Sequence, residues 1–120
     1  MAIDHDLFRR LCRARDYLCD NVDEPPSLRQ VARVAGVSPH HFLRAFRRSF
    51  GETPHEYVTR VRIERAKAAL RAGRSVTETC FSLGYASLGS FSALFRRQVG
   101  VAPTEYGRSV RRLAPSPGPR

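Results

Sequence analysis

This chain has no tryptophan, a single methionine and three cysteines among its 120 residues, and Lys67 is its one lysine. It also lacks the run of about 18 apolar residues that a membrane-spanning helix requires. Its opening MAIDHDLFRR shows none of the basic, apolar and small-residue regions of a signal peptide. We therefore expect a cytoplasmic protein that has no membrane partner.

The cysteines show no arrangement typical of a metal site. No CxxC pair or Cys/His cluster has zinc-ligand spacing, so we predict no metal and no cofactor. Cys12 and Cys19 are separated by about 10.5 Å along a predicted helix, which is too far for a disulfide. We expect these thiols and Cys80 to pack as small hydrophobic groups, and a redox sensor at Cys12 or Cys19 is the alternative.

Sequence motifs of catalysis are missing as well. The chain contains no HExxH, no GxSxG and no phosphate-binding glycine loop. Its 11 acidic residues stand mostly at predicted helix starts, where a capping role explains them. We therefore do not expect an enzyme.

Negative charge is scarce, and positive charge is correspondingly in excess. The formal net charge is +10 and the sequence pI is about 10.9, with arginine supplying almost all of the 21 basic residues. Arginine binds phosphate and guanine through two parallel hydrogen bonds. This composition favours a polyanionic partner such as a nucleic acid.

The most informative feature that is present is an internal repeat. SPHHFLRAFRRSFGETPHEY begins at Ser38 and SLGSFSALFRRQVGVAPTEY at Ser87, and nine of the twenty positions are identical at an offset of 49 residues. Each copy holds two aromatic positions four residues apart, a pair of arginines, a helix stop and a helix start. A duplicated basic helix predicts two equivalent contacts on a repetitive polyanion, for which double-stranded DNA is the obvious candidate.

Glycine, proline and capping residues divide the chain into helical segments, and no stretch alternates as a strand does. We predict an all-α fold with seven helices, at about 4–20, 28–35, 39–50, 54–72, 76–83, 88–99 and 103–112. The corresponding domains are 1–52 (a helix and a first helix-turn-helix), 53–73 (a linker helix), 74–112 (a second helix-turn-helix and a final helix) and 113–120 (a disordered tail). We expect RVRIERAK in the linker helix to be a solvated charged face in which Glu64 pairs with its neighbours.

Each half combines a short helix, a glycine-containing turn and a longer basic helix, which is the helix-turn-helix pattern. The span 7–112, and above all CFSLGYASLGSFSALFRRQVGVAPTEY, resembles the DNA-binding domain of the AraC/XylS family of bacterial transcription regulators. The resemblance implies two helix-turn-helix subdomains joined by a long helix, with two recognition helices in adjacent major-groove segments. It is closest to small stand-alone members, which lack a small-molecule domain, bind as monomers and often activate transcription through RNA polymerase.

The resemblance and the outward face of each recognition helix together nominate the contact residues. Arg44 is the best candidate for reading guanine, whereas Ala93 at the equivalent place cannot donate a hydrogen bond. The second helix therefore offers thymine-methyl contacts and phosphate clamping but little bidentate readout. The predicted base-reading residues are His40, Leu43, Arg44, Leu88, Gly89, Ser90 and Ala93. The predicted phosphate-binding residues are Ser38, His41, Arg47, Arg48, Ser87, Arg96 and Arg97.

The sequence leaves alternatives open. A sequence-specific regulator is the leading hypothesis, and a weakly specific architectural DNA-binding protein or a fragment of a larger effector-responsive regulator are others. A protein-interaction module that does not bind DNA fits poorly with the arginines. A regulator should prefer its site over other DNA by about 10³ or more, and an architectural protein by far less.

Overall fold

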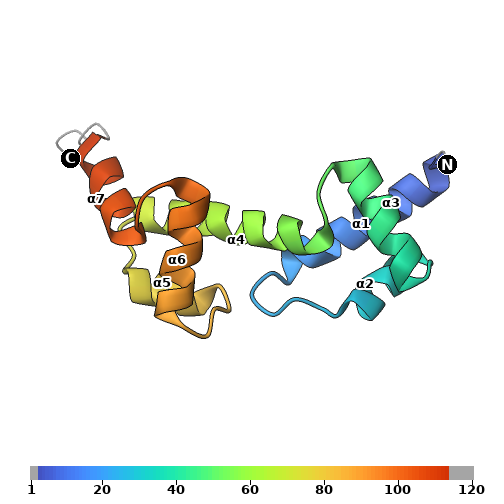
Figure 1. The fold of residues 1–120 in the computed structure, drawn as a ribbon, viewed down its shortest axis with the longest axis horizontal. Coiled ribbons are helices and arrows are strands. Elements are labelled where there is room, and N and C mark those ends of the chain that lie inside the picture. Colours follow the sequence, from blue (N-terminus) through green and yellow to red (C-terminus); the bar gives the residue numbers. More distant parts are fainter. Residues whose placement is uncertain (1–2, 114–120) are drawn as a thin grey trace, which may run out of the picture. The chain divides into compact units, whose positions relative to one another are not determined.

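The computed structural model describes residues 3–113, and these form seven helices and no strand, as predicted (Figure 1). The helices are α1 (His5–Asp20), α2 (Leu28–Ala35), α3 (Pro39–Phe50), α4 (Pro54–Arg71), α5 (Val76–Ser82), α6 (Leu88–Val99) and α7 (Pro103–Leu113). Within the described range, no helix has both the length and the apolar character needed to cross a bilayer. The predicted disordered tail lies outside the described residues from position 114 onward.

The helix starts follow from local side-chain hydrogen bonds. The hydroxyls of Ser27, Ser38, Ser75 and Ser87 each accept from the backbone N–H three residues later. Such a cap satisfies a donor that has no partner within the helix. At the start of α4, the Thr53 N–H donates to Glu56 (2.8 Å) and the Glu56 N–H donates to Thr53 (3.1 Å), which together form a capping box.

At the start of α5, Ser75 and Glu78 have the spacing of a capping box but a different pattern of hydrogen bonds. The Glu78 N–H does donate to the Ser75 hydroxyl, at 3.0 Å. The Ser75 hydroxyl in turn donates to the Glu78 carboxylate, also at 3.0 Å, so that the carboxylate binds the capping side chain.

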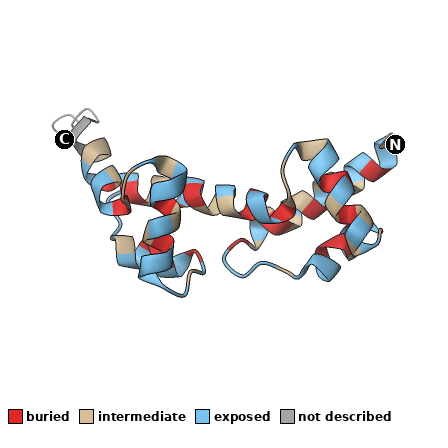
Figure 2. Cartoon of the chain, in the orientation of Figure 1, coloured by how far each residue is buried: buried red, intermediate tan, exposed pale blue. Residues whose placement is uncertain are grey.

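The chain divides into two compact units, residues 1–61 and 62–120, and the division falls within α4. In the first unit α1 packs on α2 and α3. Its buried residues are Leu7, Leu11, Ala14 and Leu18 from α1, Val22, Val31, Ala32 and Ala35 around α2, Phe42, Ala45 and Phe46 from α3, and Tyr57 and Val58 from α4. The four α1 residues form the inward face that their spacing predicts (Figure 2).

The second unit has its own core, built from α4, α5, α6 and α7. Its buried residues are Ile63, Ala66, Leu70, Cys80, Leu83, Phe91 and Phe95, with Tyr106 of α7 partly buried against them. Cys80 is thus a small core residue, as predicted, and its thiol lies 3.6 Å from the Ser87 carbonyl oxygen. Cys12 and Cys19 are half-buried and are not joined in a disulfide, and Cys19 packs against the first core.

The repeated aromatic residues make the same contacts in both units. The rings of Phe42 and Phe46 are 5.5 Å apart and those of Phe91 and Phe95 are 5.9 Å apart. The next ring packs edge-on in both cases, since Tyr57 lies 6.0 Å from Phe46 and Tyr106 lies 5.6 Å from Phe95, each at 68°. The N-terminal part of α4 therefore packs against α3 in the same way as α7 packs against α6.

The C-terminal part of α4 has a different role, because Ile63, Ala66 and Leu70 belong to the second core. They supply the second unit with the apolar helix face that α1 supplies to the first. The duplicated unit is therefore a helix, a helix-turn-helix and a closing helix. Helix α4 closes the first copy and opens the second, which explains how 120 residues accommodate both.

Candidate nucleic-acid interface

The turn before each recognition helix is held by the same backbone hydrogen bonds. The Val37 N–H donates to the Ala32 carbonyl in the first turn, and the Tyr85 N–H donates to the Cys80 carbonyl in the second. Both turns pass through a glycine with positive φ, 70° at Gly36 and 90° at Gly84. Glycine adopts this conformation without the steric penalty that other residues meet.

Helix α3 shows a clear division into a buried and an exposed face. Phe42, Ala45 and Phe46 are buried, and Ser49 and Phe50 are half-buried. The predicted contact residues lie on the remaining surface: Ser38, His40, Arg44, Arg47 and Arg48 are exposed, while His41 and Leu43 are half-buried. The structure therefore presents all the residues nominated on this helix to solvent at least in part.

Helix α6 has the same division. Phe91 and Phe95 are buried, and the nominated residues Ser87, Leu88, Gly89, Ser90, Ala93, Arg96 and Arg97 are all exposed. Positions 40 and 44 of α3, which carry histidine and arginine, correspond to positions 89 and 93 of α6 at the repeat offset. The two recognition helices thus share a core face and differ in what they expose.

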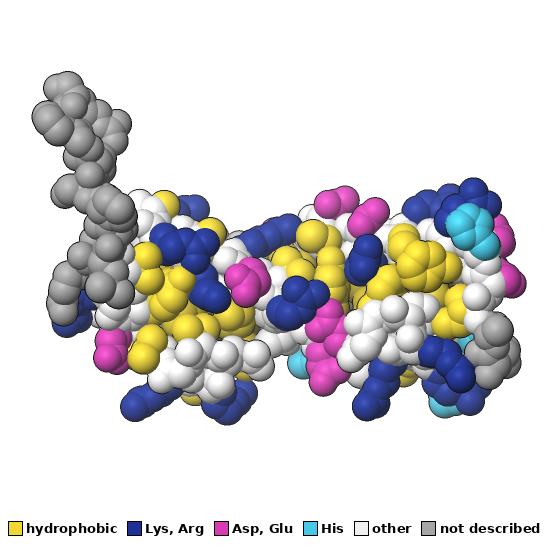
Figure 3. All heavy atoms as spheres, turned by 90° about the horizontal axis from the view of Figure 1, so that it is seen from above, with side chains coloured by type: hydrophobic (Ala, Val, Ile, Leu, Met, Phe, Trp, Pro, Cys, Tyr) yellow, Lys and Arg dark blue, Asp and Glu magenta, His cyan; other side chains and the backbone are white. Residues whose placement is uncertain are grey.

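The arginines fall into two groups according to their partners. Arg60 binds Glu52 through two nitrogens, the closest approach being 2.7 Å, and Arg10 binds Asp6 at 3.1 Å. Within the described residues, no ion pair engages the exposed arginines of α3 and α6, namely Arg44, Arg47, Arg48, Arg96 and Arg97. These side chains are available to an external anion, and Figure 3 shows Lys and Arg side chains exposed on both units.

The capping serines of the recognition helices keep a donor for a ligand. Ser38 Oγ accepts from the His41 N–H and Ser87 Oγ accepts from the Ser90 N–H, each at 3.2 Å. A serine hydroxyl that accepts one hydrogen bond still has its own hydrogen to donate. The N-terminus of a helix also attracts anions through its free N–H groups. Each serine can therefore cap its own helix and at the same time donate a hydrogen bond to a phosphate.

Two arginines outside the recognition helices support the turns, and neither contact was predicted from the sequence. Arg10 of α1 donates to the Ala35 carbonyl at the end of α2, so it holds the first turn from outside the motif. The Arg62 guanidinium of α4 lies 4.8 Å from the centre of the Tyr85 ring, which packs 5.1 Å from Phe91. Burial raises the pKa of the Tyr85 hydroxyl.

The linker segment RVRIERAK is therefore only partly the solvated charged face that we predicted. The expected pairing of Glu64 is confirmed, because its carboxylate lies 3.5 Å from the Lys67 ammonium. Arg62, in contrast, is half-buried against the second turn. The hydrophobic periodicity of the sequence does not predict this contact, because it joins Arg62 to the Tyr85 ring, 23 positions later in the chain.

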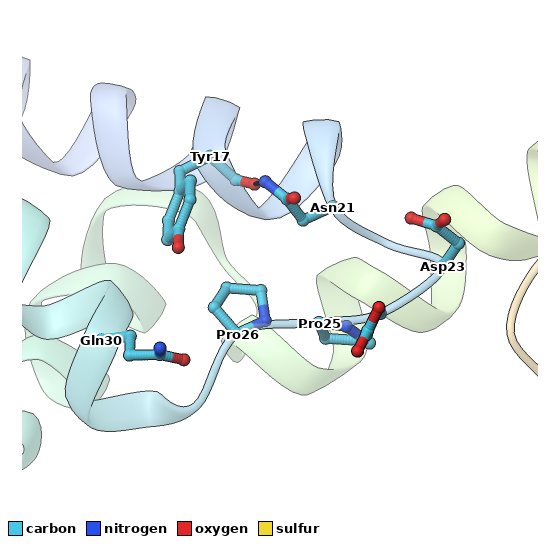
Figure 4. A pocket seen from close by; sticks show the side chains of 7 residues that line it. Tyr17, Asn21, Asp23, Pro25, Pro26 and Gln30 are labelled. Carbon is cyan, nitrogen blue, oxygen red and sulfur yellow. Dashed lines mark hydrogen bonds between the residues drawn. The ribbon is translucent and has the colours of Figure 1, made fainter.

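A cavity of about 370 Å³ lies beside the segment that joins α1 to α2, outside the recognition helices. Figure 4 shows Tyr17 and Pro26 facing this space from α1 and from the connecting segment. Its lining includes the two carboxylates of Asp23 and Glu24 and no arginine or lysine. Carboxylates repel phosphate, so this cavity does not belong to a nucleic-acid interface.

The fold and its exposed faces define a tandem helix-turn-helix protein. The profile of a helix-turn-helix domain matches residues 31–109, and the chain belongs to the AraC-type helix-turn-helix family, as its sequence indicated.

Two relatives illustrate the match. The transcriptional activator RhaS of Escherichia fergusonii is 34% identical over 103 residues, which are 85% of this chain and 37% of that protein. Regulatory protein SoxS of Salmonella typhimurium is 30% identical over 92 residues, which are 76% of this chain and 86% of that protein. The chain spans 39%, 38% and 37% of the length of the first three curated relatives that it matches.

Solved structures agree with this assignment. A transcriptional regulator with an AraC-type DNA-binding domain from Chromobacterium violaceum superposes with a TM-score of 0.80 at 25% identity, covering 89% of this chain and 96% of that one. The DNA-binding domain of AdpA, solved with a target DNA, gives a TM-score of 0.78 at 26% identity and covers 86% and 94%. The likeness therefore extends over nearly the whole described chain.

Proposed function

We propose that this protein is a sequence-specific regulator of transcription that binds double-stranded DNA. The observation that carries the proposal is the pair of helix-turn-helix motifs whose recognition helices expose arginines without ion-pair partners. The solved DNA complex of the AdpA domain supports DNA as the ligand. RhaS is named as a transcriptional activator, which supports the proposal that this protein activates transcription.

The contacts with DNA divide between the bases and the backbone. His40, Leu43 and Arg44 at the start of α3 read base edges, and Leu88, Gly89, Ser90 and Ala93 contact the bases from α6, because the first turns of a recognition helix lie deepest in the major groove. The phosphates are bound by Ser38, His41, Arg47, Arg48, Ser87, Arg96 and Arg97. Such backbone contacts fix the register of the protein on the duplex without reading its sequence.

We propose that the two recognition helices enter adjacent major-groove segments, because each unit carries its own helix-turn-helix motif. We further propose that the chain acts as a monomer in the cytoplasm, contacts RNA polymerase and catalyses no reaction. In a monomer, the tandem motif would replace the two-fold symmetry of a dimeric regulator.

A second candidate function is architectural binding with weak sequence preference. The exposed face of α6 favours it, because Leu88, Gly89 and Ala93 have no side-chain donor for bidentate recognition. The two candidates differ in the ratio of specific to non-specific affinity.

The test is a salt titration of binding, made on a duplex selected from a random pool and on an unrelated duplex. Neutralisation of about five to eight phosphate charges gives a slope of log K against log [salt] of roughly −4 to −7. We expect the selected duplex to bind at least about 10³ times more tightly. A slope near −1 on both duplexes would refute DNA binding, and a steep slope with a small ratio would identify an architectural protein.

A further inference from the structure

The centre of the exposed face differs between the two recognition helices. Residues 40 and 44 lie directly opposite the buried phenylalanines of α3, and residues 89 and 93 do so in α6, because positions four apart share a helix face. In α3 these places carry His40 and Arg44, both exposed and both able to donate hydrogen bonds. In α6 they carry Gly89 and Ala93, which have no polar side-chain atom.

The fold itself does not require glycine at position 89. Gly89 lies inside α6 and is not among the glycines with positive φ. A Cβ atom at this position would meet only the Ser87 hydroxyl oxygen, at an ordinary 3.7 Å. Gly89 is the second residue of α6, and because neither its φ nor its packing requires a glycine, the absence of a side chain leaves the backbone open to a close approach from outside.

The same end of α6 exposes a large apolar side chain. Leu88 is the first residue of the helix and is 39% exposed. Arg96 and Arg97, about two turns further along the helix, are exposed and free of ion pairs within the described residues. The apolar N-terminal end of α6 suits the floor of a major groove, where the 5-methyl groups of thymine lie. The arginines further along the helix suit the phosphates on either side of that groove.

We propose that α6 recognises thymine through its methyl groups, so that the half-site facing α6 is defined by thymines and not by guanines. Leu88 and Ala93 contact the methyls, and Gly89 lets the helix approach the base edges closely. The inference rests on the proposed DNA-binding function and specifies what the second motif recognises. Since α3 presents the donors of His40 and Arg44 at the places where α6 presents Gly89 and Ala93, the two half-sites differ in sequence despite the internal repeat.

The experiment uses the full chain and a duplex selected from a random pool. Each thymine is replaced in turn by deoxyuridine, which removes one methyl group and leaves base pairing unchanged. We expect about fourfold weaker binding for each methyl that α6 contacts, from the transfer free energy of a methyl-sized group. Restoring a methyl with 5-methylcytosine opposite guanine at such a position should recover part of the affinity that cytosine loses.

Two variants connect the effect to α6. Leu88→Ala should abolish the deoxyuridine effect at the positions that Leu88 contacts, whereas Leu43→Ala in α3 should leave it in place. Gly89→Gln, which has room for a side chain within the fold, should also lose the effect because it blocks the close approach. Circular dichroism verifies that each variant is folded.

The outcomes separate this inference from the function on which it rests. Failure to bind any duplex specifically would overturn the proposed function. Specific binding in which every deoxyuridine substitution changes affinity less than twofold would overturn thymine recognition alone. A deoxyuridine effect that persists in Leu88→Ala and Gly89→Gln and disappears in Leu43→Ala would assign the methyl contacts to α3 and also overturn it.

Discussion

Replacing Gly36 with alanine tests how α1 controls the first turn. Gly36 has a φ of +70°, and a Cβ atom there would lie 2.9 Å from Nη1 of Arg10. The guanidinium would have to shift, and we predict that this shift disrupts its hydrogen bond to the Ala35 carbonyl. The substitution therefore combines backbone strain in the turn with the loss of a contact from another helix.

The magnitude follows from these two contributions. A non-glycine residue in the left-handed region is destabilised by about 1–2 kcal/mol. A lost hydrogen bond adds about 1 kcal/mol, so we expect the free energy of unfolding to fall by about 2–3 kcal/mol. Gly51→Ala is the matched control, because Gly51 has a φ of +77° with nothing within 4 Å of the added Cβ atom. Gly51→Ala should therefore lower the free energy of unfolding by about 1–2 kcal/mol, from the backbone strain alone.

The assay is denaturant unfolding followed by circular dichroism on a double-mutant cycle. In the Arg10→Ala background, Gly36→Ala should be no more destabilising than Gly51→Ala, because the contact is already gone. This corresponds to a coupling of about 1 kcal/mol between positions 10 and 36. The reasoning is refuted if the two substitutions are additive, or if Gly36→Ala and Gly51→Ala are equally destabilising in the original chain.

Three further predictions concern DNA binding and pH. Arg44→Ala should weaken binding to the selected duplex by about 1–3 kcal/mol and relax preference at one or two base pairs, whereas Arg97→Ala should weaken all duplexes alike and flatten the salt slope by about one. One residue inserted after Val61, at the boundary between the two cores, rotates the following part of α4 by about 100° and shifts it by about 1.5 Å without separating residues of either core. Circular dichroism should then show a helical protein, and competition binding should show non-specific affinity without specific affinity; unchanged specific affinity would mean that only one motif reads DNA. Hydrogen bonds from Thr53 lower the pKa of the Glu56 carboxyl below its ordinary 4.5. Glu56 therefore adds stability above pH 4.5 that is lost as the pH falls through its folded-state pKa, and Glu56→Gln should reduce the dependence of unfolding on acid pH; an unchanged dependence would contradict this role.

The exposed faces were predictable because helices bury one side at a fixed period. Phe42 and Phe46 recur four residues apart, and their repeats Phe91 and Phe95 do the same, so the opposite residues had to face solvent. The structure shows the candidate base-reading and phosphate-binding residues exposed, apart from the half-buried His41 and Leu43, and their roles on DNA stay predictions. The repeat also locates both motifs in the chain, because the identical positions include the capping serine, the two core phenylalanines, the arginine pair and the closing glycine of each recognition helix.

The sequence by itself determined the helices and their order. Caps such as Ser38 and stops such as Gly51 act within three or four residues, so their effect can be read locally, and helix ends agree with prediction to within about two residues. Only the tertiary structure decided that α4 closes one unit and opens the next, that Arg10 reaches the Ala35 carbonyl and that Arg62 lies over Tyr85. The reason is physical: these contacts depend on how helices cross and on the rotamers of long side chains, and a local periodic pattern encodes neither.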